Sequence, residues 1–154
     1  MRVVIAADHA GFELKQKLLP IIRQEFDPDV QDMGTYNEDS CDYPRFAVRV
    51  AHTVVAGRAS FGILICGTGI GMSVAANKVR GAVAALCGDC YSARMAREHN
   101  DAGILCLGGR VLGPGVAEDI VREFLTAEPI TGVDRYVHRR QQVCEIERGT
   151  PTND

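Results

Sequence analysis

Short, continuously apolar runs recur along the chain, and a polar segment follows each of them. Four of these runs are clear: Val3–Ala7, Phe61–Cys66, Gly81–Leu86 and Gly103–Leu107. Runs of this length without alternation of apolar and polar residues are typical of strands that are buried on both faces, as in a parallel sheet. A fainter strand is predicted at Val30–Met33, where Gly34 and a polar loop follow.

Segments with apolar residues at helical spacing separate the apolar runs. The spacing appears in three sets: Leu14, Leu18 and Ile22; Phe46, Val50 and Val54; and Val116, Ile120 and Phe124. Pro114 marks the expected start of the third of these helices, and Pro129 its end, because proline is favoured in a first turn and disfavours helix before it. A last helix is predicted over residues 134–147 and a loose tail over 149–154. The alternation of strand and helix predicts one α/β domain over residues 1–148.

Length, composition and charge narrow the class of protein. The chain has 154 residues, 46% of them hydrophobic, which is enough for one core. Its net charge of -3 is spread along the sequence, so bulk charge points to neither nucleic acid nor membrane as a partner. The first apolar run meets Asp8 too soon to form the core of a signal peptide, so the six cysteines are interpreted as reduced thiols of a cytoplasmic protein.

Residues whose side chains can take part in catalysis or ligand binding follow the apolar runs. Asp8 and His9 come directly after the first, the segment 66–71 closes the second, and Arg110 follows the fourth. Ligands of open α/β sheets bind beyond the carboxyl ends of the strands. We therefore expect these segments to meet at one edge of the sheet.

The segment 66–71 reads Cys-Gly-Thr-Gly-Ile-Gly, between a buried strand and a helix expected to begin near Met72. Its backbone N–H groups can converge on an anion. It is not a dinucleotide fingerprint, which would need glycine where the chain has Val74, nor a Walker loop. A thiol at the end of a strand, facing a helix start, is favoured as thiolate, so Cys66 is a candidate general base.

Structural interpretations remain open for several residues taken singly. Asp8 can be a helix cap, and Asn100 can simply end a helix. Cys106 and Cys144 are expected to be small buried hydrophobes. Cys87 and Cys90 form an isolated C-x-x-C, without the second ligand pair that zinc requires.

Taken together, five segments resemble the type B ribose-5-phosphate isomerase family, which includes the galactose-6-phosphate isomerase subunits. The resemblance covers roughly the whole chain in matching order. It is carried by Ala7-Asp8-His9-Ala10-Gly11, Asp42-Tyr43-Pro44, residues 65–73, Ala75-Ala76-Asn77-Lys78 and Arg97-Glu98-His99-Asn100-Asp101.

The resemblance implies a fold and an assembly. It implies a Rossmann-like three-layer sandwich with a mostly parallel sheet of about five strands, and a C-terminal helix that packs on a partner subunit. The active sites would lie at the interface of a homodimer, often paired into a tetramer. The substrate would be a phosphorylated sugar, with no metal or organic cofactor.

The resemblance also implies roles for individual residues. Cys66 would move the proton between C1 and C2, and Thr68 with the N–H groups of the loop (Gly67, Gly69, Ile70 and Gly71) would hold the enediolate oxygen. His99, with Asp8, is associated with opening the sugar ring. Asn100 and Tyr43 would position the sugar.

Phosphate binding falls, by matching position, to four residues: His9, Arg110, Arg135 and Arg139. Arg135 and Arg139 are four apart on the predicted last helix and share a face, although a solvated basic face is the alternative. The chain departs from the family pattern here, because Tyr136 and not histidine follows the first arginine. His138 and Arg140 add to the positive charge of that helix. Met72 supports the assignment of Cys66 as the base. Family members that lack this cysteine place a glutamate base after the glycine loop, at the position where this chain has Met72.

The leading hypothesis is interconversion of ribose 5-phosphate and ribulose 5-phosphate through a cis-enediolate. The same chemistry on a tetrose 4-phosphate or a hexose 6-phosphate remains open, because function lies in the site and not in the fold. A non-catalytic sugar-phosphate or nucleotide binding module would need neither Cys66 nor His99. A redox protein that uses Cys87 and Cys90 would leave the glycine loop unexplained.

Overall fold

Five parallel strands form one sheet, in the order β2-β1-β3-β5-β4. The computed structural model describes residues 1–150. Its elements are β1 (Val3–Ala7), α1 (Phe12–Glu25), β2 (Gln31–Asp32), α2 (Tyr43–Val55), β3 (Phe61–Cys66), α3 (Ile70–Ala76), β4 (Ala84–Leu86), α4 (Cys90–Glu98), β5 (Ile104–Gly108), α5 (Pro114–Thr126) and α6 (Asp134–Glu147).

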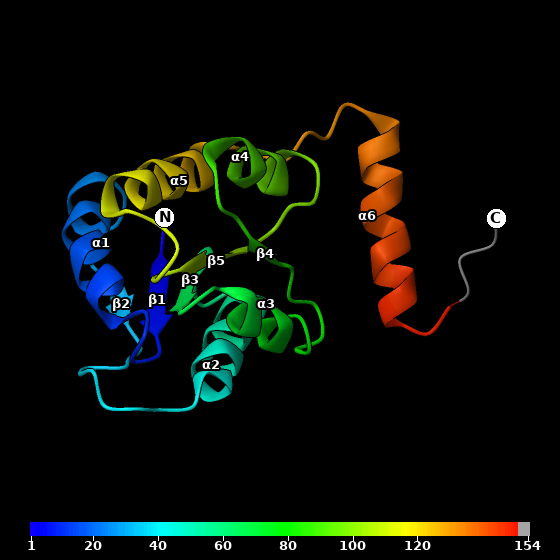
Figure 1. Cartoon of the computed structure of the whole chain (residues 1–154). Helices are drawn as coiled ribbons and strands as arrows, with labels where there is room; N and C mark the ends of the chain where they lie inside the picture. Colours follow the sequence, from blue (N-terminus) through cyan, green and yellow to red (C-terminus); the bar gives the residue numbers. More distant parts are fainter. Residues whose placement is uncertain (151–154) are drawn as a thin grey trace.

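The sheet is the middle layer of a three-layer sandwich (Figure 1). Helices α1, α4 and α5 cover one face, and α2 and α3 cover the other. Successive residues of a strand point to opposite faces, so Ile63 and Ile65 pack with the first group of helices, whereas Leu64 and Cys66 pack with the second. This double burial explains why the central strands read as unbroken apolar runs.

The order of the strands determines where a ligand can bind. The chain adds β2 on one side of β1 and then crosses to β3 on the other side, so the loops that follow β1 and β3 diverge. In open α/β sheets, such a switch point leaves a crevice at the carboxyl ends of the strands. Asp8 and Cys66 stand at the ends of these two strands, as the sequence predicts.

The predicted elements agree with the structure in type, and most boundaries agree closely. The last helix covers the predicted residues 134–147, while the helix expected near Met72 begins at Ile70. The two edge strands are shorter than predicted: the strand expected at Val30–Met33 is Gln31–Asp32, and the one expected at Gly81–Leu86 is Ala84–Leu86. Edge strands pair on one side only, so fewer backbone hydrogen bonds extend them. Of the predicted tail at 149–154, residues 151–154 lie outside the described residues.

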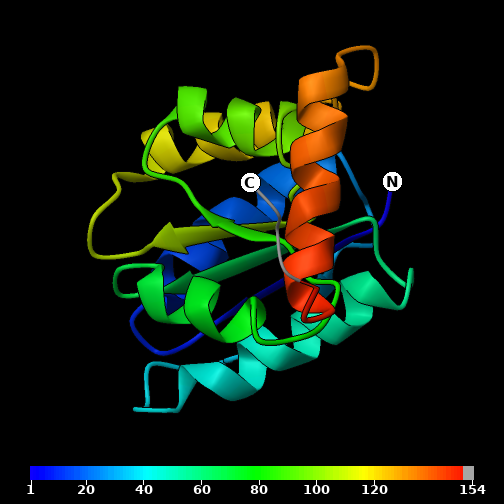
Figure 2. The ribbon, with the colours of Figure 1, turned by 90° about the vertical axis from the view of Figure 1, so that its right-hand side faces the viewer.

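Helix α6 stands apart from the sandwich. In Figure 2 it rises upright in front of the sheet edge that β4 forms. No residue of α6 is buried, and Val143 and Ile146 are 53% and 61% exposed. The prediction that Cys144 is a buried hydrophobe is therefore wrong, because the helix that carries it packs into no core. No helix within residues 1–150 has both the length and the apolar composition needed to cross a membrane.

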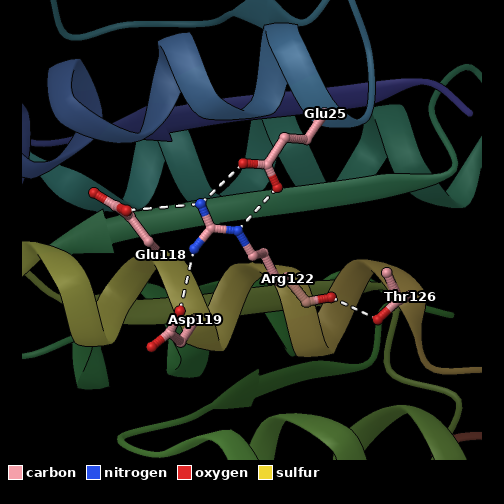
Figure 3. Close-up of polar contacts among 5 residues, drawn as sticks. All are labelled: Glu25, Glu118, Asp119, Arg122 and Thr126. Atoms are coloured by element: carbon pink, nitrogen blue, oxygen red, sulfur yellow. Dashed lines mark hydrogen bonds and ion pairs between the residues drawn. The ribbon is translucent and has the colours of Figure 1, made fainter.

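A polar network ties α1 to α5 at the surface (Figure 3). The guanidinium of Arg122 donates two hydrogen bonds of 2.9 Å to the carboxylate of Glu25 and one of 3.1 Å to Asp119. A carboxylate oxygen of Glu118 lies 3.7 Å from Nη2 of Arg122. The hydrogen bonds that Arg122 donates to Glu25 lower the pKa of this carboxyl group. The groups are exposed to solvent, so the network orients the two helices more than it stabilises the fold.

Replacement of Gly11 tests the close approach between α1 and β3. A Cβ atom at residue 11 would lie 2.5 Å from the carbonyl oxygen of Ile65 and 2.7 Å from its Cγ2. We expect Gly11→Ala to lower the free energy of unfolding by about 1–3 kcal/mol in urea titrations, the usual cost of overpacking. The control is Gly115→Ala in α5, where no atom lies within 4 Å of the added methyl group. It should leave stability unchanged or raise it by about 0.5–1 kcal/mol, because alanine favours helix over glycine. Equal stability of the two variants would contradict the contact.

Candidate active site

The end of β1 forms a tight turn around the side chain of Asp8. This residue is 6% exposed, and its Oδ1 accepts hydrogen bonds from the N–H groups of Ala10 at 2.9 Å and Gly11 at 3.1 Å. Its own N–H donates to the carbonyl of Ile65 in β3. The capping role that the sequence allowed for Asp8 is therefore present, although the carboxylate caps the turn ahead of α1, whose N-cap is Gly11. This turn directs His9 outward.

Cys66 ends β3 at the boundary between the core and the glycine loop. Its side chain is 5% exposed and packs with Met72 and Cys106 on the α2 and α3 side of the sheet. The Sγ atom accepts a hydrogen bond of 3.2 Å from the N–H of Gly69. The sulfur thus faces the loop that the sequence singled out, and a hydrogen bond of this kind stabilises negative charge on it.

The glycine loop turns sharply from β3 into α3. Gly69 has φ +79°, and a Cβ atom there would lie 2.9 Å from the backbone carbon of Leu107, so only glycine fits. The N–H of Ile70 donates to Oγ1 of Thr68 at 3.3 Å, which leaves the hydroxyl hydrogen of this exposed threonine free to donate outward. Among residues 1–150, the N–H groups of Thr68 and Gly71 have no acceptor. Of the loop N–H groups that the resemblance assigns to the enediolate oxygen, those of Gly69 and Ile70 thus donate within the loop, whereas that of Gly71 is available.

Tyr43 closes one side of the glycine loop. It is the first residue of α2 and is 38% exposed. Its ring lies against Gly71, where a Cβ atom would be 2.7 Å from Cζ of the ring. Tyr43, to which the resemblance assigns a part in positioning the sugar, thus lies beside this loop.

His9 and Arg110 meet at a cavity of about 390 Å³ beyond the ends of β1 and β5. Glu13, Lys17 and Glu38 also line this cavity. The N–H of Arg110 donates to the carbonyl of Gly67 at 3.0 Å, and its exposed side chain runs along that glycine. Two of the four predicted phosphate ligands thus line one cavity, and Arg110 also contacts the glycine loop.

One contact at this cavity had no counterpart in the sequence analysis. The backbone N–H of Cys41 donates to Nδ1 of His9 at 3.2 Å, across 32 residues of chain. A backbone donor leaves no mark on residue type, so only the course of the loop could reveal it. The contact shows that the loop between β2 and α2 belongs to the site.

His99 and Asn100 do not lie near Cys66 and the glycine loop. They follow α4, which runs antiparallel to the strands, so they are at the end of the sheet opposite Cys66. The ring of His99 stacks on Tyr136 of α6, with centroids 4.2 Å apart and planes at 14°. Asn100 is exposed and lines a different cavity, of about 430 Å³, between α6 and the sandwich. Within one chain, the structure does not bring these two residues to Cys66.

Arg97 anchors the segment that carries His99 and Asn100. Its guanidinium packs over the rings of Phe61 and Phe124, and its Nη1 donates to Asp101 at 2.7 Å and to the carbonyl of Ala102 at 2.9 Å. A buried arginine with satisfied Nη1 donors holds this turn rigidly. The resemblance included Arg97 in a motif, but its burial under two aromatic rings was not predicted.

The arginines of α6 also lie away from Cys66. Arg135 is exposed and donates to the hydroxyl of Tyr136 at 2.9 Å. Arg139 is exposed, with no hydrogen-bond or ion-pair partner in the described part of the chain. Arg140 is the one that contacts the body of the protein, through the carbonyls of His99 and Ile130. Arg135 and Arg139 thus face solvent, near His99 and not near the glycine loop.

The C-x-x-C pair does not look like a redox centre. Burial, together with the charge of Asp89, raises the pKa of Cys87 to about 11. The pKa of Cys90 is also raised, whereas an attacking thiol of a redox motif needs a lowered one. Within residues 1–150, no three His, Cys, Asp or Glu side chains gather as a metal site would require.

The glycine loop, Cys66 and the cavity of His9 and Arg110 match a known family. The family model described as Ribose/Galactose Isomerase matches residues 3–143. The chain belongs to this family. Ribose-5-phosphate isomerase B of Escherichia coli (strain K12) is 40% identical over 147 residues, which are 96% of this chain and 97% of that protein.

Solved structures of the ribose/galactose isomerase family share the fold of this chain. Ribose-5-phosphate isomerase B of Clostridium thermocellum has a TM-score of 0.93 at 46% identity, with 97% of this chain and 99% of that chain covered. The structure of Mycoplasma genitalium ribose-5-phosphate isomerase B with bound ribulose 5-phosphate has a TM-score of 0.89 at 37% identity and covers 97% of both chains. The chain is therefore a sugar-phosphate isomerase of the aldose–ketose type.

Alkylation tests the interpretation of Cys87. Only the thiolate reacts with iodoacetamide, and with a pKa of about 11 roughly one Cys87 in 10³ is ionised at pH 8. We expect mass spectrometry to find Cys87 unmodified at pH 8 under conditions that modify the exposed Cys144 completely. Raising the pH toward 11 should increase modification of Cys87. Similar rates for both cysteines at pH 8 would contradict the assignment.

Proposed function

We propose that this protein interconverts D-ribose 5-phosphate and D-ribulose 5-phosphate, with Cys66 as general base and without a metal or organic cofactor. The contact between Cys66 Sγ and the N–H of Gly69 carries the proposal, because it joins the base to the donors of the glycine loop. The relatives support the substrate. Several bear the name ribose-5-phosphate isomerase B, and one of their structures holds ribulose 5-phosphate.

The chemistry follows from the weak acidity of a C–H bond beside a carbonyl. The thiolate of Cys66 removes the proton from C2 of the open-chain aldose, which gives a cis-enediolate with its negative charge on O1. The hydroxyl proton of O2 then moves to O1, and the thiol of Cys66 returns the first proton to C1, so both protons are conserved. Negative charge develops on the carbonyl oxygen, where the Thr68 hydroxyl and the N–H groups of Thr68 and Gly71 donate. Donors that are fixed before the reaction need no reorganisation during it.

The phosphate binds at the cavity of His9 and Arg110. The planar guanidinium of Arg110 fits phosphate oxygens, and His9 adds a hydrogen-bond donor. Tyr43, which packs on Gly71, then borders the sugar between the phosphate and the thiolate. In this arrangement the charged groups lie at the phosphate, and mainly neutral hydrogen-bond donors lie at the reacting carbons.

The site is completed by a second copy of the chain in a homodimer. His99, Asn100, Arg135 and Arg139 have roles in the proposed reaction, but within one chain they lie at the far end of the sheet from Cys66. Helix α6, which carries both arginines, has no buried residue and exposes Val137, Val143 and Ile146. Val143 and Ile146 are three residues apart and share one side of the helix, where exposed apolar side chains are suited to contact a partner. His99 of one copy, with Asp8 of the other, would then open the sugar ring.

A tetrose 4-phosphate or a hexose 6-phosphate is the alternative substrate. The reacting carbons of these sugars are the same, and the chain length alters only the distance from the carbonyl to the phosphate. Tyr136 after Arg135 is the feature that could change this distance, because it departs from the family pattern at the phosphate end. A second-order rate constant for each sugar decides among them.

Isomerase assays of Cys66→Ala test the base. Chelator-treated protein is incubated with ribose 5-phosphate, erythrose 4-phosphate and allose 6-phosphate separately, and ketose formation is measured. We expect the highest kcat/KM with ribose 5-phosphate. Cys66→Ala should lower kcat on that sugar by at least about 10², as expected for loss of a general base, while the sugar still binds.

The matched control for the base is Cys87→Ala, another buried cysteine, which directly follows β4 in the same sheet. It should retain kcat within a few-fold. Equal losses in the two variants would show that the effect of Cys66→Ala comes from packing and not from proton transfer. A preference for one of the other sugars would change the substrate and leave the base in place.

Complementation tests the shared site. Cys66→Ala and His99→Asn are each expected to be poorly active. Co-expressed in equal amounts, they form mixed dimers in half of the cases, and each mixed dimer has one intact site out of two. We therefore expect about a quarter of the wild-type activity. The control pair is Cys66→Ala with Thr68→Ala, whose mixed dimers have no intact site. Activity no higher than that of the separate variants would contradict a site built from two copies.

A further inference from the structure

Lys15 is a buried charge that the proposed reaction does not use. It lies in α1, its side chain has no exposed surface, and it is among the largest fully buried side chains in the described part of the chain. Lysine is rarely buried completely unless it is paired. Burial of an ammonium group is costly, so the contacts that compensate it should indicate what the group does.

The ammonium of Lys15 binds the start of the loop that follows β2. It donates to both carboxylate oxygens of Asp32, at 2.6 and 2.7 Å, and to the carbonyl of Thr35 at 2.5 Å. All three of its N–H donors are thus satisfied. The rings of Phe12 and Tyr36 lie 5.5 and 5.2 Å from Nζ, within the range of cation–π attraction.

The same carboxylate and its neighbours fix the first residues of the loop. Asp32 Oδ1 also accepts from the N–H of Gly34 at 2.9 Å, and the Tyr36 hydroxyl donates to the carbonyl of Asp32 at 3.1 Å. The N–H of Thr35 donates to the carbonyl of Ala7 at the end of β1. Residues 32–36 are therefore held in place both by Lys15 of α1 and by the end of β1.

The far part of this loop reaches the candidate active site. Glu38 lines the cavity of His9 and Arg110, and the N–H of Cys41 donates to Nδ1 of His9 at 3.2 Å. An Nδ1 atom that accepts a hydrogen bond carries no proton, so the neutral ring carries its proton on Nε2. The loop thus determines which nitrogen of His9 can donate to a ligand.

We propose that Lys15 is a positioning residue for the phosphosugar site: by anchoring the loop 33–42, it holds the Cys41 N–H on Nδ1 of His9 and keeps this histidine as the Nε2–H donor. The kinetic consequence rests on the proposed function, because it requires His9 to bind the phosphate. The prediction for the tautomer of His9 does not rest on the proposed function, because the tautomer is a property of the free protein.

Nitrogen-15 NMR of the imidazole rings tests the tautomer directly. The chain has four histidines, and loss of one set of signals in His9→Gln assigns those of His9. In the wild type, we expect Nε2 to bear the proton and Nδ1 to be the unprotonated, pyridine-like nitrogen. A wild-type His9 protonated mainly at Nδ1 would overturn the proposal without any variant of Lys15.

The variant Lys15→Met/Asp32→Asn then removes both charges together, so that no unpaired carboxylate is left behind to unfold the protein. Circular dichroism checks that it is folded. We expect the His9 signals to shift toward a mixture of tautomers, and KM for ribose 5-phosphate to rise about tenfold while kcat falls less than threefold. A merely structural role would lower stability and leave the His9 signals in place.

Arg23→Met is the matched control, because it removes one positive charge from an exposed position of the same helix. It should leave both the His9 signals and KM unchanged. Unchanged His9 signals in the folded double variant would overturn the role of Lys15, whatever the kinetics. Failure of the wild type to isomerise any of the three sugar phosphates would instead overturn the proposed function, and the NMR result would be unaffected.

Discussion

The site depends on how closely the backbone approaches itself at the carboxyl ends of β1, β3 and β5. Asp8 donates to the carbonyl of Ile65, and the residues after β5 donate to the carbonyls of Cys66 and Gly67. Gly11 lies so near Ile65 that a single added methyl group would clash with the backbone. These contacts bring the turn of Asp8 and His9, the glycine loop and Arg110 together at one end of the sheet. Polar loops alone would not bring them together.

At this end of the sheet, the charged groups and the neutral hydrogen-bond donors occupy different places. Cys66 faces backbone N–H groups, which stabilise a developing negative charge without adding a formal positive one. The cationic Arg110 and the neighbouring His9 lie beyond them at the cavity. This separation suits a substrate with a permanent charge at one end and a transient one at the other. The buried ammonium of Lys15 pairs with Asp32 beneath the loop that follows β2.

The α/β architecture also explains why one chain holds only part of the proposed machinery. A helix that follows a parallel strand returns antiparallel to it, so a residue at the end of α4 cannot reach the carboxyl edge of the same sheet. His99 and Asn100 are such residues. Helix α6 leaves the sandwich beside them and carries Arg135 and Arg139 outward. The fold therefore separates Cys66 and the glycine loop from His99, Arg135 and Arg139, and the proposed dimer would bring them together.

The sequence by itself determined the α/β class, the central strands and the last helix, because residues buried on both sides of a sheet or along one side of a helix leave local periodic patterns. It also singled out Cys66, the glycine loop and Arg110 as candidates, since each lies at or shortly after the end of an apolar run. Only the tertiary structure decided that Lys15 is buried and Cys144 exposed, that Cys41 contacts His9, and that His99 is remote from Cys66. These facts depend on contacts between segments distant in the chain, and burial and backbone hydrogen bonds of that kind leave no local pattern.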